Sequence, residues 1–281
     1  MGVFSRTWAL MGASWRVLML DKELLLFPIL STIAVGLVAM TFVAPLAENP
    51  SWLQSGDTAS EWDQFVAATR LFLFYVSTYF TVVFFNASLV AAVYLRLTGG
   101  NPTLMDGMRG AWARKGELLA WVLLAATVGV ILQAMKERSD WVMRLILGTI
   151  GVAWSLATFF VVPILVIEGK GPIEAIKESA MTLKRTWGEE LAGGLSYGGL
   201  SFFFSLPALA VAMFGVGSLV HGNLLNGLLL IGAAIAYGFL LSLTMTTLSS
   251  IFNVAVYHYA RTGSVPLGFD AALLQSAFVK K

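Results

Sequence analysis

Residues 98–106 read TGGNPTLMD and residues 262–270 read TGSVPLGFD, with four identities at a separation of 164 positions. A related form, EGKGP, occupies residues 168–172. Each copy places Gly-x-x-Pro directly after a long apolar run. Glycine is common just past a helix C-terminus because it accepts a left-handed backbone, and proline is favoured in the first turn of a helix. The pattern therefore predicts three places where one helix ends and another begins in a new direction.

The apolar runs themselves are long. The chain has 281 residues, of which 58% are hydrophobic and 12% are charged. About 18 consecutive apolar residues are enough to cross a bilayer as a helix, and these runs lack the alternation of barrel strands. Six runs qualify, at residues 24–46, 71–95, 118–135, 142–167, 191–216 and 224–257. The sequence predicts an all-α membrane protein with six transmembrane helices in a single domain, 1–281.

The segments at the cytoplasmic ends of these runs are amphipathic. Apolar residues recur there at steps of three and four, which places them on one face of a helix. The four stripes are Phe4, Trp8, Met11, Trp15 and Leu18; Leu104, Met108 and Trp112; Ile173, Ile176, Ala180, Leu183 and Trp187; and Phe269, Leu273 and Ala277. We expect four amphipathic helices that lie in the plane of the membrane surface.

The recurrence of the glycine–proline pattern suggests an internal repeat. The units would cover approximately residues 1–97, 98–169 and 170–261, each with one in-plane helix and one hairpin of transmembrane helices. A C-terminal amphipathic helix, 262–281, would follow the third unit. The alternative is that unrelated helix junctions share ordinary capping chemistry.

The basic residues are distributed unevenly. Of 18 Lys and Arg residues, 14 fall in the segments before the first run, after the last run, and in the second and fourth connections. Positive charge accumulates on the cytoplasmic side, so both termini are predicted to be cytoplasmic. The outer connection 47–69 is acidic, and we interpret it as a solvated exterior loop, with cation binding as the alternative. The first apolar run is too long for a cleavable signal peptide and is expected to be retained.

Tryptophan at the membrane surface and a basic polar face both suit lipid headgroups. The expected headgroup contacts are Trp8, Trp15, Arg16, Trp112, Lys177, Lys184, Arg185 and Trp187. Membrane lipids are therefore the predicted partners, and nothing in the sequence resembles a nucleic-acid-binding module.

Small polar residues follow one face of the sixth run. They are Ser242, Thr246, Ser249, Asn253 and Tyr257, and Asn86 occupies a similar place in the second run. They could line a narrow polar path, or they could hydrogen-bond between packed helices. The runs hold no ionisable residue away from their edges, which disfavours proton-coupled transport. Pro28, Pro163 and Pro207 are expected to kink the first, fourth and fifth runs.

No residues form a convincing catalytic or metal site. Residues 194–198, GLSYG, match the nucleophile-elbow pattern, and His258 is an imaginable base, but the motif begins a membrane helix instead of following a strand. Gly194 and Gly198 also form a small-residue packing face. Cysteine is absent, and the two histidines lack partners at metal-binding spacing. We predict a protein that is not an enzyme and has no cofactor or metal.

Two stretches carry resemblances. WALMGASWRVLMLDKELLLFPILS (residues 8–31) resembles the N-terminus of an uncharacterised prokaryotic membrane-protein family, filed as a domain of unknown function. FFVVPILVIEGKGPIEAIKESAMTLKRTWG (residues 159–188) is similar to the membrane domains attached to some glycerophosphodiester phosphodiesterases. The first resemblance implies a multi-pass protein of the prokaryotic cell (inner) membrane, and neither supplies an active site.

The functional prediction is a non-enzymatic, lipid-interacting or membrane-organising scaffold, present as a homo-oligomer or as a subunit of a membrane complex. The alternative is an uncoupled channel or carrier for a small or apolar solute, which would use the polar residues of the second and sixth runs.

Overall fold

The computed structural model describes residues 3–48, 60–187, 197–271 and 274, with side chains for residues 8–44, 60–184, 201–271 and 274. Within these ranges the regular structure is entirely helical. Six helices among the described residues are long and apolar enough to cross a membrane: Lys22–Ala44, Glu61–Leu97, Lys115–Glu137, Trp141–Glu168, Ser201–Val220 and Leu224–Thr262. The prediction of an all-helical chain with six long apolar helices is confirmed.

The chain divides into two compact units. The terminal unit combines Met1–Leu25 with Trp187–Lys281, and the central unit is Leu26–Thr186. The terminal unit therefore joins both ends of the chain. The single membrane domain expected over residues 1–281 stays a prediction.

The central unit is organised around its longest helix, α3. Its helices are α2 (Leu26–Glu48), α3 (Glu61–Leu97), α4 (Leu104–Ala113), α5 (Lys115–Glu137), α6 (Trp141–Ala157), α7 (Val161–Pro163), the π-helix η3 (Ile164–Glu168) and α8 (Pro172–Trp187). The helices α2, α4, α5, α7 and η3 all contact α3, and α5 also contacts α6. The rings of Trp121 and Trp154 stack between α5 and α6, with centroids 6.2 Å apart.

Small residues let α4 approach α3 closely. A Cβ atom built on Gly107 would lie 2.6 Å from the carbonyl oxygen of Ser88 and 2.5 Å from Cζ of Phe27. A Cβ atom on Gly110 would lie 2.7 Å from Cβ of Ala91. Glycine is therefore required at residue 107 by its surroundings, since both neighbours are buried and one is backbone.

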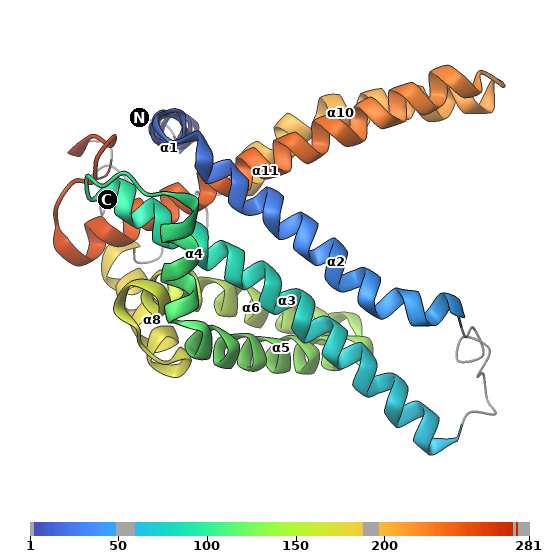
Figure 1. The fold of residues 1–281 in the computed structure, drawn as a ribbon, viewed down its shortest axis with the longest axis horizontal. Helices are drawn as coiled ribbons and strands as arrows, with labels where there is room; N and C mark the ends of the chain where they lie inside the picture. The colour runs from blue at the N-terminus through green and yellow to red at the C-terminus, as the bar shows by residue number, and fades with distance from the viewer. Residues whose placement is uncertain (1–2, 49–59, 188–196, 272–273, 275–281) are drawn as a thin grey trace. The chain divides into compact units, whose positions relative to one another are not determined.

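The terminal unit contains α1 (Val3–Leu20), η1 (Lys22–Leu25), α10 (Tyr197–Val220) and α11 (Leu224–Thr262). The helices α10 and α11 run side by side (Figure 1), and α1 packs on α11. The hydroxyl of Tyr237 donates a hydrogen bond to the Phe204 carbonyl across the α10–α11 pair, at 3.0 Å. The first helix of the chain is thus packed against its last long helix.

The three predicted junction glycines all adopt the left-handed backbone. The φ angles are +92° at Gly99, +68° at Gly169 and +69° at Gly263. The three junction prolines were predicted to lie in the first turn of a helix, but only Pro172 begins a helix. Pro102 precedes the N-cap residue of α4, and Pro266 is followed by a further turn.

The second copy of the opening motif continues differently from the first. Residues 263–270 are not helical, and Gly268 adopts φ of +85°. Phe269 therefore lies outside a helix, and its predicted place on an amphipathic helix starting at residue 262 was wrong. The reason is local: the first copy has Thr103 as an N-cap, whereas the second has Leu267, which cannot cap a helix, followed by a left-handed glycine. Leu273 and Ala277 lie outside the described residues.

The fourth apolar run is interrupted. The helix α6 ends at Ala157, turns occupy residues 158–160, and the chain resumes as α7 and η3. Pro163 cannot donate the helical hydrogen bond to the residue four positions earlier. Within the interruption, the N–H of Phe160 donates to Oγ of Ser179 in α8, at 2.9 Å, and both residues are buried.

The outer connection is shorter than predicted, because α3 begins at Glu61 and residues 61–69 are helical. Ser60 and Asp63 form a capping box, in which the Ser60 hydroxyl accepts from the Asp63 N–H at 3.2 Å. Glu61 and Asp63 therefore meet the positive end of the helix dipole. Asp57, on which the acidic loop also depended, lies outside the described residues.

Candidate functional site

Three helices outside the six candidate spans, namely α1, α4 and α8, share one pattern of burial. In α8, Ala175 and Ser179 are fully buried, whereas Ile173 is 61% exposed. In α4, Ala111 is fully buried and Trp112 is 60% exposed. The small residues Ala111, Ala175 and Ser179 thus face the protein, whereas Trp112 and Ile173 face outward.

The helix α1 repeats this arrangement in the terminal unit. Ala13 and Ser14 are fully buried, and Trp8 and Trp15 are exposed. The Trp8 ring stacks on Phe204 of α10, with centroids 6.1 Å apart. One edge of this tryptophan is therefore held by protein while more than half of its surface stays open.

The side chains predicted to contact headgroups are exposed wherever the structure describes them: Trp8, Trp15, Arg16, Trp112, Lys177 and Lys184. Arg185 and Trp187 lie in α8, but their side chains fall outside the described set. The stripes are not uniform faces, because Leu18 and Leu183 are buried although they share predicted stripes with exposed residues. Each of their helices also packs on protein, and this contact buries the residues along one edge of the stripe.

Trp112 is held in place by two neighbours. The ammonium of Lys115 lies 4.6 Å from the centroid of its ring, and the Phe84 ring meets it edge-on with centroids 6.2 Å apart. A cation–π contact at an exposed site contributes about 0.5–1 kcal/mol. The arrangement places a cation beside an exposed indole at the junction of α4 and α5.

A charged cluster that sequence reasoning missed joins η3 to α8. The Lys170 ammonium lies 2.8 Å from Glu168 and also contacts Glu178. These two carboxylates raise the pKa of Lys170, with Glu168 contributing most. Because the folded pKa is raised, the stabilisation is complete at neutral pH and is lost only as pH rises through that value. The sequence signal for this charged cluster was the placement of Glu168 and Lys170 on either side of a glycine.

The Arg114 guanidinium covers Gly169 within this cluster. A Cβ atom on Gly169 would lie 2.4 Å from Cζ of Arg114. Arg114 itself lies 3.9 Å from Glu117. The junction of α4 with α5 is therefore in contact with the junction of η3 with α8.

We predict that Gly169→Ala lowers the free energy of unfolding by about 1–2 kcal/mol, because an L-residue resists the left-handed backbone. The matched control is Gly171→Ala, since a Cβ atom there meets nothing within 4 Å and its φ is not left-handed. Thermal unfolding in detergent, followed by intrinsic fluorescence, measures both. Equal midpoints for the two variants would contradict the prediction.

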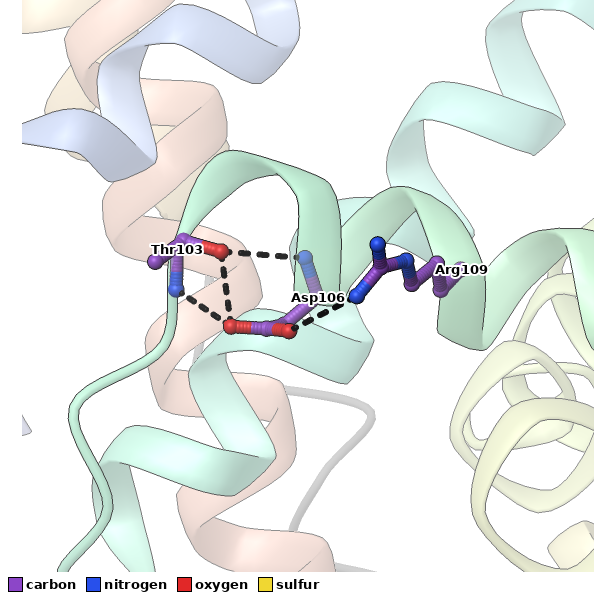
Figure 2. A network of polar contacts seen from close by, with 3 residues as sticks. All are labelled: Thr103, Asp106 and Arg109. Carbon is purple, nitrogen blue, oxygen red and sulfur yellow. Dashed lines mark hydrogen bonds and ion pairs between the residues drawn. The ribbon is translucent and has the colours of Figure 1, made fainter.

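The first copy of the motif ends in a capping box at the start of α4 (Figure 2). The Thr103 hydroxyl accepts from the Asp106 N–H at 3.3 Å, and the Thr103 N–H donates to the Asp106 carboxylate at 2.9 Å. Arg109 lies 4.0 Å from the same carboxylate. The hydroxyl and backbone hydrogen bonds of Thr103 lower the pKa of Asp106.

Thr103→Ala should lower the free energy of unfolding by about 1 kcal/mol at neutral pH, because the cap is lost. The lowered pKa of Asp106 means that the stabilisation is complete at neutral pH and disappears as pH falls through that value. The difference in the free energy of unfolding between wild type and variant should therefore become smaller below about pH 4. Thr103→Ser keeps the hydroxyl and should behave as wild type in thermal unfolding at each pH.

The predicted polar residues of α11 vary in burial. Ser242 and Thr246 are exposed, Ser249 and Asn253 are half-buried, and Tyr257 is buried. The fully buried hydroxyl of this helix is that of Thr247, which donates to the Leu243 carbonyl of its own helix at 2.9 Å. Such back-bonding satisfies a hydroxyl without a partner helix.

Asn86 is half-buried in α3, in the central unit, whereas Asn253 belongs to the terminal unit. The 164-residue offset of the motif pairs Asn86 with Ser250 and Asn253 with Leu89. The two asparagines therefore differ by three positions within the suggested repeat, and their common role stays a prediction.

The structure describes one of the two weak catalytic candidates, His258. His258 Nε2 lies 3.4 Å from Oγ of Ser264, at the end of α11. Ser196 of the elbow pattern lies outside the residues that the structure describes. Among those that it does describe, no group of three His, Cys, Asp or Glu residues could hold a metal ion.

These features define a class: an all-helical protein with six helices fit to cross a membrane and shorter helices that present tryptophan outward. The chain belongs to a family of unknown function, DUF6159, whose model matches residues 65–267. The match includes the Gly–Pro junctions and residues 159–188, but not residues 8–31. No curated protein and no solved structure matches the chain. The likeness of residues 159–188 to phosphodiesterase membrane domains stays a prediction.

Proposed function

We propose that this protein is a non-enzymatic membrane scaffold that organises lipid through α1, α4 and α8, which lie flat at the cytoplasmic surface of a prokaryotic inner membrane. The carrying observation is the outward placement of Trp8, Trp15 and Trp112 on helices whose small residues face the protein. Exposing such rings to water is energetically unfavourable, whereas placing them at the headgroup level of a bilayer is favourable.

The distribution of charge supports the same orientation. Arg16, Lys115 and Lys177 are exposed on or beside these helices, as expected for a surface that faces anionic lipid. With both termini cytoplasmic, the α2–α3 connection would be outside. The repeat of in-plane helix and hairpin, and assembly as a homo-oligomer or as a subunit of a complex, belong to the same proposal.

The sequence has no cysteine, so each introduced cysteine is the sole labelling site. Site-specific labelling therefore tests the proposal directly. Met105→Cys and Ile173→Cys report on the outward faces of α4 and α8, and Asn101→Cys reports on the exposed junction before α4. In reconstituted vesicles, a fluorophore at residues 105 and 173 should be quenched by nitroxide-labelled lipid chains. The fluorophore at residue 101 should be quenched mainly by aqueous iodide.

Sidedness is tested in intact cells with a membrane-impermeant maleimide. Glu61→Cys should be labelled at once, and Asn101→Cys only after permeabilisation. Equal iodide quenching at residues 101 and 105 would overturn lipid contact by α4. Labelling of residue 101 in intact cells would overturn the orientation.

One observation favours a second candidate, an uncoupled channel or carrier: the interruption of the fourth run at residues 158–160. Broken helices line substrate paths in many transporters. Here Phe160, Val161 and Ile164 are fully buried around the break, which favours a packed element over a path. Vesicles containing the protein should therefore shrink and reswell in urea or glycerol as empty vesicles do, and faster reswelling would favour transport.

A further inference from the structure

A shallow hollow of about 420 Å³ lies where α8 begins. It is lined by Gly171, Pro172, Ile173, Glu174 and Lys177. Most of its surface is apolar, and its two charged residues have opposite signs. Volumes of this order accommodate a small ligand or a headgroup.

The two charges beside the hollow are available to a ligand. Glu174 and Lys177 are exposed, and neither forms an ion pair with any residue that the structure describes. Lys170, four positions before Glu174, is held by Glu168 and Glu178 and does not neutralise Glu174. Residues three apart on a helix are neighbours on its surface, so the carboxylate and the ammonium flank one space.

We propose that this hollow binds the headgroup of an aminophospholipid, whose phosphate meets Lys177 and whose primary ammonium meets Glu174. The inference rests on the proposed function, because it requires α8 to lie against lipid. A purely anionic headgroup would be repelled by Glu174. A quaternary choline headgroup carries no N–H to donate to that carboxylate, whereas a primary ammonium has three.

The apolar surface beside the hollow fits the remainder of the lipid. Ile173, Lys177 and Met181 follow one another at four-residue steps and share one face of α8. Ile173 and Met181 are both largely exposed. The glycerol and first methylene groups would pack on these two side chains while the headgroup occupies the hollow.

The test uses the full chain in detergent and native mass spectrometry with phosphatidylethanolamine, phosphatidylcholine and phosphatidylglycerol of identical acyl chains. The wild type should retain phosphatidylethanolamine best. Glu174→Gln should lower its retention roughly fivefold without lowering that of phosphatidylglycerol, as expected for one exposed ionic contact. Lys177→Gln should lower the retention of all three lipids.

Two further variants separate the hollow from the general basic surface. Gly171→Leu should fill the hollow and lower phosphatidylethanolamine retention, since a side chain there enters open space. Arg109→Gln removes an exposed cation of α4, outside the hollow, and should leave the headgroup preference unchanged.

Different results would overturn the headgroup site and the proposed function. Unchanged preference in Glu174→Gln, or a wild type that prefers phosphatidylglycerol, would overturn the hollow as an aminophospholipid site while the lipid quenching at residues 105 and 173 still stands. Loss of that quenching, with no lipid retained by the wild type, would overturn the proposed function itself.

Discussion

Gly107→Ala is expected to lower the free energy of unfolding by about 1–3 kcal/mol, the usual range for overpacking a well-filled interior. The added methyl group would lie 2.6 Å from the Ser88 carbonyl oxygen and 2.5 Å from Phe27. Phe27 is 1% exposed, so its ring has little room to move, and the carbonyl belongs to the backbone of α3. The helix α4 must therefore shift away from α3, which would lower the apparent melting temperature by roughly 3–10 °C.

Gly116→Ala is the matched control for this change. Gly116 lies in the first turn of α5, and a Cβ atom there meets nothing within 4 Å. Alanine in a helix is favoured over glycine by about 0.5–1 kcal/mol, so this variant should melt at or slightly above the wild-type temperature. If both variants melt together in detergent, α4 does not pack on α3 through residue 107.

Gly227→Val should separate α10 from α11, at an expected loss of about 2–3 kcal/mol. A Cβ atom on Gly227 would lie 2.4 Å from Leu219 and 3.0 Å from the carbonyl oxygen of Gly215. A Cβ atom built on Gly215 would in turn lie 3.1 Å from the Gly227 carbonyl oxygen. Helices in a membrane associate largely by such close packing, because lipid gives no hydrophobic drive.

Gly232→Val provides the comparison within the same helix, because the space around residue 232 is open. Both variants place the same β-branched side chain in α11, so the difference between them isolates the contact with α10. Unfolding midpoints in a graded series of detergent and denaturant measure that difference. A Gly232→Val variant that loses as much stability as Gly227→Val would show that the glycine contact is unimportant.

The features that the sequence predicted correctly depend on local chemistry. Six apolar helices follow from run length alone. The left-handed backbone at Gly99, Gly169 and Gly263 follows from the absence of a side chain at the end of a helix. The sequence also contains the signal for the capping box of Ser60 and Asp63, which is Ser-x-x-Asp before an apolar run. This signal was not used in the prediction, and it would have placed the start of α3 correctly.

The features that were missed depend on contacts between distant residues. Periodicity identifies a stripe but not which side meets protein, so the burial of Leu18 and Leu183 beside exposed Trp8 and Ile173 was not predictable. The small residues Gly107 and Ala111 held the better signal, because small residues mark close helix contacts. The break in the fourth run is held by Ser179, a hydrogen-bond partner 19 positions from Phe160.

The packing of α1 on α11 sets an order on biogenesis. Translation delivers residues 3–20 before the long helix that ends at Thr262. The helix α1 is therefore synthesised before its packing partner, and its contact with α11 forms only after α11 has been made. A chain truncated before α11 would leave α1 without this packing partner.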